Sequence, residues 1–146
     1  MNKTKIVSRK MAREAAMKLI YELEIHKDDW EKQFESEIVN LEAGDNDIKY
    51  INKVVRGVYT NLSFLDANIE NNARGWKLNR ISKVELAILR LALYEIAFIE
   101  DIPFSVSVNE AVELAKKYST KEAGSFVNGI LANFENLNNS KVAKEG

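Results

Sequence analysis

Two consecutive helices are predicted by residues 101–134, which read DIPFSVSVNEAVELAKKYSTKEAGSFVNGILANF. Each helix is expected to start at a Ser-x-x-Glu sequence, Ser107 with Glu110 and Ser119 with Glu122. At this spacing the serine hydroxyl and the glutamate carboxylate can both accept hydrogen bonds from free backbone N–H groups of the first turn. We therefore expect helices from Val108 to Tyr118 and from Thr120 or Lys121 to Asn136. The second contains a Phe-Val-Asn-Gly run that simple packing does not require.

The segment just before this stretch is the most apolar of the chain. Residues 84–99 are hydrophobic on nearly all sides of a helix, so we expect a central core helix around which the others pack. Ser82 with Glu85 predicts its start by the same capping sequence, and it should run from Lys83 to Glu100. Charged residues interrupt the segment, which is also too short to cross a bilayer.

Farther toward the N-terminus, apolar residues recur every three and four positions, as in amphipathic helices. We expect a helix from Ser8 to His26, a shorter one with Trp30, Phe34, Ile38 and Leu41 on its apolar stripe, and a long one over 47–73 that bends near Gly57 or Asn61. The single proline, the few glycines and the absence of alternating runs leave little basis for a sheet. The predicted fold is all-α, a bundle of six to seven helices that forms one unit or two sub-bundles. Residues 1–136 are expected to form one domain and 137–146 a flexible polar tail.

Composition limits the kinds of function. With 146 residues, of which 46% are hydrophobic, the chain can bury a single core. It has no cysteine and one histidine, His26, so disulfides, thiolate metal sites and histidine clusters are excluded, and we expect no metal and no cofactor. Neither a signal peptide nor a membrane span is visible, which fits a cytoplasmic protein. The glycine-rich phosphate loops and the Gly-x-Ser-x-Gly nucleophile motif are missing, so we do not expect an enzyme.

Charge is segregated along the chain, although the net charge is only −1. The first 13 residues carry +5 without any acidic residue, and the remainder carries −6. A basic end on an acidic body indicates local docking of a polyanion. The alternative is a solvated basic terminus that has no partner.

A helical wheel of residues 8–26 places four polar residues on one arc beside the apolar face: Arg9, Lys10, Arg13 and Tyr21. Cations for phosphates and a ring for an unstacked base are what recognition of single-stranded RNA requires. The alternative is a basic helix face whose side chains cover apolar surface while their charges stay in water.

The helix expected over 120–136 offers a second surface. Phe126 lies at the edge of its buried stripe, on the flank shared with Glu122 and Gly129, so it is either half exposed or packed under a neighbouring helix. Asn128 points away from this flank and could equally hold a neighbouring loop or contact a base.

Four blocks of the chain resemble, in the right order, the NusB family of bacterial transcription antitermination factors: 9–21, 57–66, 84–96 and 101–134. The resemblance implies a helical RNA-binding protein, monomeric or weakly dimeric, that does not act at a membrane. Its RNA would be of the single-stranded boxA type, bound together with the small-subunit ribosomal protein NusE. With other Nus factors, such a protein helps elongating RNA polymerase to resist termination on ribosomal-RNA operons.

The resemblance also implies roles for individual residues. The expected RNA contacts are Arg9, Lys10, Arg13, Tyr21, Glu122 and Phe126, and Glu85 is the expected contact with NusE. The chain has fewer arginines near its start than many members of the family, and Glu122 stands where they often have Asp. Two alternatives stay open: the NusB-like RNA-binding domain of a ribosomal-RNA methyltransferase system, and a helical protein-interaction module without RNA affinity.

Overall fold

The computed structural model describes residues 3–140, without the side chains of residues 27 and 138–140. This part of the chain is almost entirely helical, which confirms the all-α prediction. Its helices and strands are β1 (Thr4–Lys5), α1 (Arg9–Leu23), α2 (Trp30–Ile38), β2 (Leu41–Glu42), α3 (Asp45–Thr60), α4 (Leu62–Asn71), α5 (Lys83–Phe98), α6 (Phe104–Tyr118), α7 (Lys121–Leu131) and α8 (Glu135–Ser140). Three short 3₁₀ segments, η1 (Glu24–Asp29), η2 (Leu78–Arg80) and η3 (Ala132–Phe134), connect some of them.

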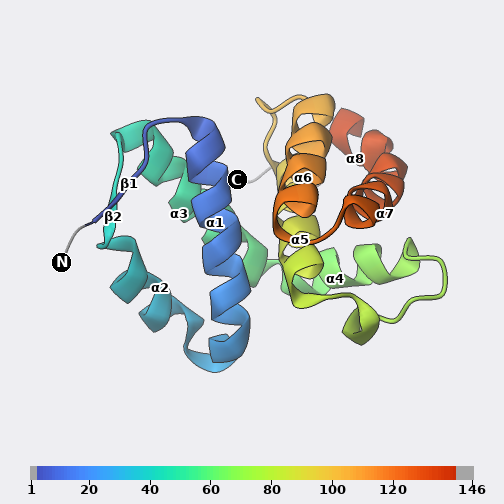
Figure 1. Ribbon diagram of the computed structural model, residues 1–146, viewed down its shortest axis with the longest axis horizontal. Coiled ribbons are helices and arrows are strands. Elements are labelled where there is room, and N and C mark those ends of the chain that lie inside the picture. The colour runs from blue at the N-terminus through green and yellow to red at the C-terminus, as the bar shows by residue number, and fades with distance from the viewer. Residues whose placement is uncertain (1–2, 141–146) are drawn as a thin grey trace.

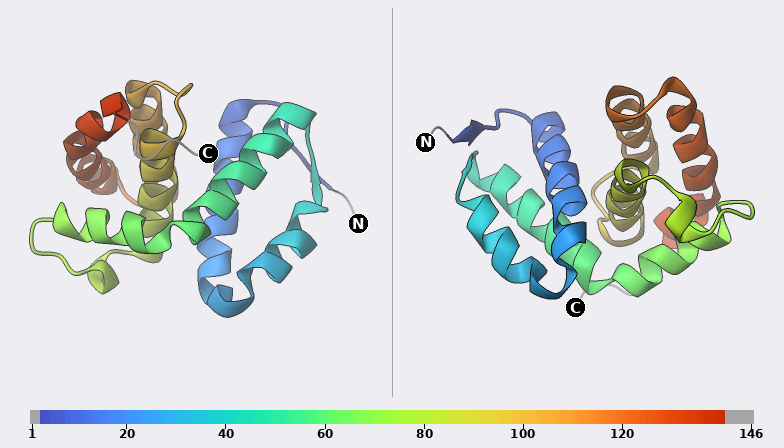
Figure 2. Two further views of the ribbon diagram at one scale, coloured as in Figure 1. Left: turned by 180° about the vertical axis from the view of Figure 1, so that it is seen from behind. Right: turned by 60° about the horizontal axis from the view of Figure 1, so that its bottom comes forward.

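The helices form two sub-bundles that lie side by side (Figures 1 and 2). Helices α1, α2 and α3 form the first, and α4 to α8 form the second. The chain passes from one to the other between α3 and α4, where Asn61 leaves helical geometry with φ −118° and ψ 25°. The bend predicted near Gly57 or Asn61 is therefore at Asn61.

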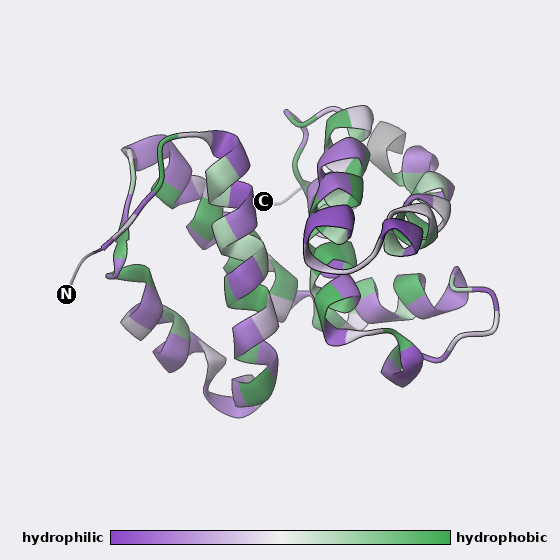
Figure 3. Cartoon of the chain, viewed as in Figure 1, coloured by the Kyte–Doolittle hydropathy of each residue, from purple (hydrophilic) through white to green (hydrophobic). Residues whose placement is uncertain are grey.

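Helix α5 is the centre of the molecule, as its apolar sequence predicts. Every residue from Leu86 to Ala97 is buried. Helix α5 packs against α1 and α3 of the first sub-bundle and against α4, α6, α7 and α8 of the second. In Figure 3, α5 is largely hydrophobic, whereas the side of α6 that faces the viewer is largely hydrophilic. One hydrophobic core thus joins the two sub-bundles.

Helices α3 and α5 approach each other closely at Gly57. A Cβ atom at this position would lie 2.2 Å from the ring of Tyr94, which is buried on α5. No side chain fits there, so glycine is what allows the α3 backbone to lie against the tyrosine ring.

Several boundaries differ from the predicted ones. Helix α1 ends at Leu23 and is followed by the 3₁₀ segment η1, within which His26 leaves helical geometry with φ −111° and ψ 42°. Strands β1 and β2, which no alternating pattern predicted, pair in parallel over two residues each. Helix α8 extends to Ser140, within the range expected to be a polar tail, and residues 141–146 lie outside the described residues. Within residues 3–140, no helix has the length and apolar character needed to cross a membrane.

Candidate nucleic-acid interface

The first turn of α1 carries two exposed cations, Arg9 and Lys10. Ser8 begins this helix, since its hydroxyl oxygen accepts a hydrogen bond of 3.1 Å from the backbone N–H of Met11. The turn contains no acidic residue, although a helix N-terminus favours negative charge and disfavours positive charge. These two cations therefore do not stabilise their own helix, and their contacts are with residues of other helices.

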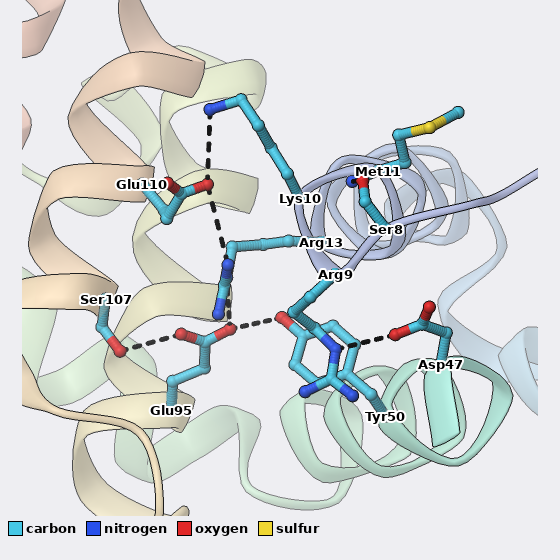
Figure 4. A network of polar contacts seen from close by, with 10 residues as sticks. All are labelled: Ser8, Arg9, Lys10, Met11, Arg13, Asp47, Tyr50, Glu95, Ser107 and Glu110. Carbon is cyan, nitrogen blue, oxygen red and sulfur yellow. Dashed lines mark hydrogen bonds and ion pairs between the residues drawn. The ribbon is translucent and has the colours of Figure 1, made fainter. Parts of the chain in front are cut away.

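Both cations pair with carboxylates of other helices (Figure 4). Arg9 Nε lies 2.9 Å from Asp47 Oδ1 on α3, and its guanidinium is 4.5 Å from the centre of the Tyr50 ring. Lys10 Nζ lies 3.6 Å from Glu110 Oε1 on α6. The side chains of Arg9 and Lys10 remain 43% and 69% exposed. Exposed ion pairs contribute only about 0–1 kcal/mol, so a phosphate can replace either carboxylate at little cost.

Arg13 lies on the same arc of the wheel, but its side chain points into the contact between the sub-bundles and is only 7% exposed. Its Nε donates a hydrogen bond of 2.8 Å to Glu95 Oε2 on α5, and its Nη1 lies 3.7 Å from Glu110 Oε1. Burial is the largest single effect and lowers the pKa of Arg13, but the charge and hydrogen bond of Glu95, together with Tyr50 and Glu110, outweigh burial, and the pKa is raised. Arg13 is therefore a fixed cation between α1, α5 and α6.

Glu95 is fully buried and accepts two further hydrogen bonds besides that of Arg13. The Tyr50 hydroxyl on α3 donates to one oxygen, and the Ser107 hydroxyl on α6 donates to the other at 2.8 Å. Burial and the adjacent carboxylate raise the pKa of Tyr50 well above its ordinary value, so the phenol keeps its proton and remains a donor. Four helices thus meet at one carboxylate (Figure 4).

The prediction that Ser107 caps a helix is wrong. Helix α6 already begins at Phe104, directly after Pro103, so Ser107 lies in its second turn. Its hydroxyl is used by Glu95 of α5 instead of by its own helix. The Glu110 carboxylate, which was expected to complete the capping sequence, faces Lys10 and Arg13 of α1.

Farther along α1, a second polar contact joins this helix to the end of α6. Glu14 Oε2 accepts a hydrogen bond of 2.5 Å from the Tyr118 hydroxyl and lies 2.7 Å from Lys117 Nζ. Burial raises the pKa of Glu14, but the hydrogen bonds from Lys117 and Tyr118 and the charges of Lys117 and Lys18 together outweigh burial, and the pKa is lowered. The Lys18 ammonium lies 5.3 Å from the centre of the Tyr118 ring. Tyr21, which follows Lys18 on α1 after one turn, is 40% exposed.

The junction of α6 and α7 also differs from its predicted form. Thr120 and not Ser119 caps α7, because its hydroxyl oxygen accepts a 3.0 Å hydrogen bond from the backbone N–H of Ala123. The Ser119 hydroxyl instead donates to Glu85 Oε2 on α5 at 2.9 Å. Glu122 is exposed in the first turn of α7, where its negative charge suits the helix dipole.

Helix α5 starts where predicted, at Lys83, with the serine half of the predicted capping sequence. The Ser82 hydroxyl oxygen accepts a hydrogen bond of 3.1 Å from the backbone N–H of Glu85. This cap uses only the backbone of Glu85, so the half-buried carboxylate is available to Ser119. Glu85 consequently links the start of α5 to the junction of α6 and α7.

Phe126 is partly buried, in keeping with its place at the edge of the apolar stripe of α7. Its neighbour Val127 is completely buried, whereas Asn128 and Gly129 are exposed. Phe126 and Gly129 line an open pocket of about 240 Å³ together with the loop that follows α4. This loop contributes Trp76, which is 52% exposed.

The predicted residues do not form one continuous cluster. Arg9 and Lys10 lie at the start of α1, and Tyr21 follows about 18 Å farther along the helix. Glu122 and Phe126 lie on α7. Sequence reasoning missed Trp76, although a signal was present: this tryptophan stands among cations in residues 71–84, a segment without any acidic residue.

Comparison with known proteins decides the family. The model of the NusB family matches residues 10–136, most of the chain. The chain belongs to the NusB family. This NusB-family chain is 55% identical over 125 residues to the transcription antitermination protein NusB of Acetivibrio thermocellus, covering 86% of each chain. It is 44% identical over 135 residues to that of Clostridium acetobutylicum, covering 92% of this chain and all of the relative.

Solved structures show the same fold. T. maritima NusB superimposes with a TM-score of 0.80 at 35% identity, covering 93% of each chain. A crystal structure of antitermination factors NusB and NusE in complex with dsRNA contains a chain with a TM-score of 0.77 at 26% identity, covering 88% of this NusB-family chain and 96% of the other. The family resemblance expected from the four sequence blocks is confirmed.

Proposed function

We propose that the chain is a transcription antitermination factor that binds boxA-type single-stranded RNA together with NusE. It supports elongation through ribosomal-RNA operons in an RNA polymerase complex with other Nus factors. In this role it acts in the cytoplasm by binding, without catalysis. The observation that carries the proposal is family membership over residues 10–136, together with relatives of similar length that are named transcription antitermination protein NusB.

The solved complex of a relative with NusE and RNA supports the choice of partners. The RNA of that complex is double-stranded, whereas we propose a single-stranded site. Unpaired bases can stack on side chains and present their edges, and sequence-specific recognition of RNA depends mostly on such bases. Duplex RNA is therefore a necessary comparison in any binding test.

Arg9 and Lys10 are proposed to contact phosphates. Both side chains are exposed, and their present carboxylate partners hold them only weakly. Arg13 is assigned a positioning role, because its guanidinium is enclosed by Glu95 and Glu110. It fixes α1 against α5 and α6 and so determines where Arg9 and Lys10 lie.

Tyr21, Glu122 and Phe126 are proposed to contact bases. Tyr21 and Phe126 have rings that are partly exposed and can stack on a base. The exposed carboxylate of Glu122 can accept a hydrogen bond from a base donor such as the amino group of cytosine.

Glu85 is proposed to contact NusE. It lies at the start of the central helix, where its carboxylate is half buried and held by the Ser119 hydroxyl. A carboxylate fixed in this way loses little conformational freedom when a cationic partner group binds, which favours its use in an interface.

The proposal is tested by titrating labelled RNA with the protein, in the presence and absence of NusE, and following fluorescence anisotropy. A boxA-type strand should bind more tightly than a scrambled strand of equal length and composition, and more tightly than the same sequence in a duplex. NusE should increase the affinity. Equal affinity for the boxA-type and scrambled strands would contradict the proposal, and so would preference for the duplex.

A further inference from the structure

The loop between α4 and α5 presents an aromatic ring among cations. Residues 71–84 contain Arg74, Lys77, Arg80 and Lys83 and no acidic residue. Trp76, in the middle of this run, is the most exposed aromatic side chain of residues 3–140. Within the same residues no ion pair is found for Arg74, Lys77 or Arg80, in contrast to Arg9, Lys10 and Arg13.

The backbone of this loop holds Arg74 and Trp76 beside α7. The N–H of Trp76 donates to the carbonyl of Ala73 at 3.1 Å, and both residues between them have positive φ, 48° at Arg74 and 89° at Gly75. This is the geometry of a tight type I′ turn. Positive φ is uncommon for a residue other than glycine, and its cost indicates a position that the surrounding structure fixes. Figure 1 shows the loop curling under α7, at the end of the molecule away from the N-terminus.

A pocket of about 240 Å³ lies between this turn and α7. Asn72, Arg74 and Trp76 line one side, and Phe126 and Gly129 line the other. Drug-sized ligands occupy about 300–1,000 Å³, so this space suits a single planar ring. Two aromatic rings supply the stacking surface that a nucleobase uses, and the guanidinium of Arg74 supplies hydrogen-bond donors. The amide nitrogen of Asn72 already donates to the carbonyl of Asn68 at 2.8 Å, which leaves the amide oxygen as an acceptor.

Gly129 gives independent support for an occupant. A Cβ atom added at this position would meet nothing within 4 Å, so close packing does not require glycine here. Its φ is not positive, so the backbone does not require glycine either. Glycine inside a helix is destabilising relative to alanine. The bare backbone keeps the mouth of the pocket open.

We propose that this pocket binds one unstacked base of the RNA against Trp76 and Phe126, with neighbouring phosphates contacted by Arg74 and Lys77. The proposal rests on the RNA-binding function proposed above and adds a second contact region, on the sub-bundle opposite Arg9 and Lys10. Phe126 thereby shares its base with a residue from another part of the chain.

The two tryptophans allow a direct test. Trp30 stacks on Tyr59, with ring centres 5.2 Å apart, and Trp30→Phe leaves Trp76 as the only tryptophan. Titration of this variant with boxA-type RNA should quench the emission of Trp76 with the same midpoint as the anisotropy of labelled RNA. If the anisotropy shows that RNA binds but the emission of Trp76 does not change, the pocket does not bind a base, and the proposed function stands. If no RNA binds, both proposals fall. If NusE alone quenches the emission of Trp76 and RNA quenches it no further, the pocket binds protein instead of RNA, and the proposal is wrong.

Substitutions distinguish the contribution of the base contact to RNA affinity from that of the phosphate contacts. Trp76→Ala should weaken binding about 5- to 150-fold, the range for loss of one base stack, without changing its salt dependence. Arg74→Asn with Lys77→Ala should instead lower the salt dependence, and Asn tolerates the positive φ at position 74. Gly129→Leu should weaken binding while leaving thermal stability unchanged or higher, an outcome that unfolding cannot produce.

RNA with single abasic sites completes the test. One abasic position should weaken binding to the parent protein and have little further effect on the Trp76→Ala variant, because both changes remove the same stack. If the losses from Trp76→Ala and from every abasic position are simply additive, no base lies on Trp76 and the proposal is wrong.

Discussion

Arg13 Nε and Glu95 Oε2 lie 2.8 Å apart, although the two residues are 82 positions apart in the sequence. Both side chains are almost completely buried where α1 meets α5. The pair therefore fixes the orientation of the helix that carries Arg9 and Lys10. A cation that the sequence assigns to the RNA surface is used inside the protein to position that surface.

We expect Arg13→Ala to destabilise the protein by about 3–5 kcal/mol, because it leaves the Glu95 carboxylate buried without its cation. Urea unfolding measures this loss. Arg9→Ala, which removes an exposed pair of the same type, is the matched control and should cost no more than about 1 kcal/mol. If the two variants lose similar amounts of stability, the buried ion pair contributes no more to stability than the exposed one.

Arg9→Ala combined with Lys10→Ala should reduce the slope of log affinity against log salt by about 1.4, since each phosphate contact on single strands contributes about 0.7. Stability should barely change, because both ion pairs are exposed. Lys32→Ala combined with Lys49→Ala removes two exposed lysines from α2 and α3 as a control. An equal fall in slope for the control would show that only total charge matters.

Glu85→Lys should weaken NusE binding roughly tenfold, with an effect that depends on salt, and leave RNA affinity in the absence of NusE nearly unchanged. Helix α5 should still form, because Ser82 caps it through the backbone of residue 85. Glu85→Gln keeps an acceptor for Ser119 and tests the charge alone. Glu100→Lys, just beyond the other end of α5, is the control for charge reversal. NusE binding at parental affinity by Glu85→Lys would place the partner site elsewhere.

Phe126→Ala and Val127→Ala should have opposite effects. Phe126 is partly exposed, so its truncation should cost about 1–3 kcal/mol in RNA binding and less stability than the 3–5 kcal/mol lost with a fully buried Phe. Val127 is completely buried, and its truncation should cost about 2 kcal/mol of stability and little RNA affinity. Denaturant unfolding and RNA titration of both variants show whether each residue serves stability or RNA binding. A badly destabilised Phe126→Ala protein would show that this ring belongs to the core.

Local sequence patterns predicted the features that depend on near neighbours. The burial of α5 follows from apolar residues around its whole circumference, and the cap at Ser82 from a hydroxyl three residues before a free N–H. The same Ser-x-x-Glu spacing failed at Ser107 and Ser119, because both hydroxyls bond to glutamates of α5 that are distant in sequence. Spacing along the chain cannot reveal such competing partners.

In the candidate site, too, local features could be predicted from the sequence and contacts between distant residues could not. A helical wheel gives the direction of Arg13 but not the presence of Glu95 opposite it, which depends on how α5 docks. Trp76 was overlooked because it lies outside any periodic segment, and its exposure becomes evident only once the turn at Arg74 and Gly75 is known. Residues in helices were therefore easier to assign than residues in loops.

Within residues 3–140 the chain passes once from the first sub-bundle to the second, at Asn61, so the first sub-bundle is synthesised before the central helix that covers it. Helices α1 and α3 leave the ribosome first, but both pack against α5, which ends at Phe98. At about 5–20 residues per second, roughly 2–8 s separate the emergence of residue 60 from that of residue 98. Throughout this interval the apolar faces of α1 and α3 that α5 will cover remain open. During this interval the nascent chain is exposed to chaperones and to aggregation. The arrival of α5 covers α1 and α3, and the rest of α5 is covered only when α6, α7 and α8 have followed.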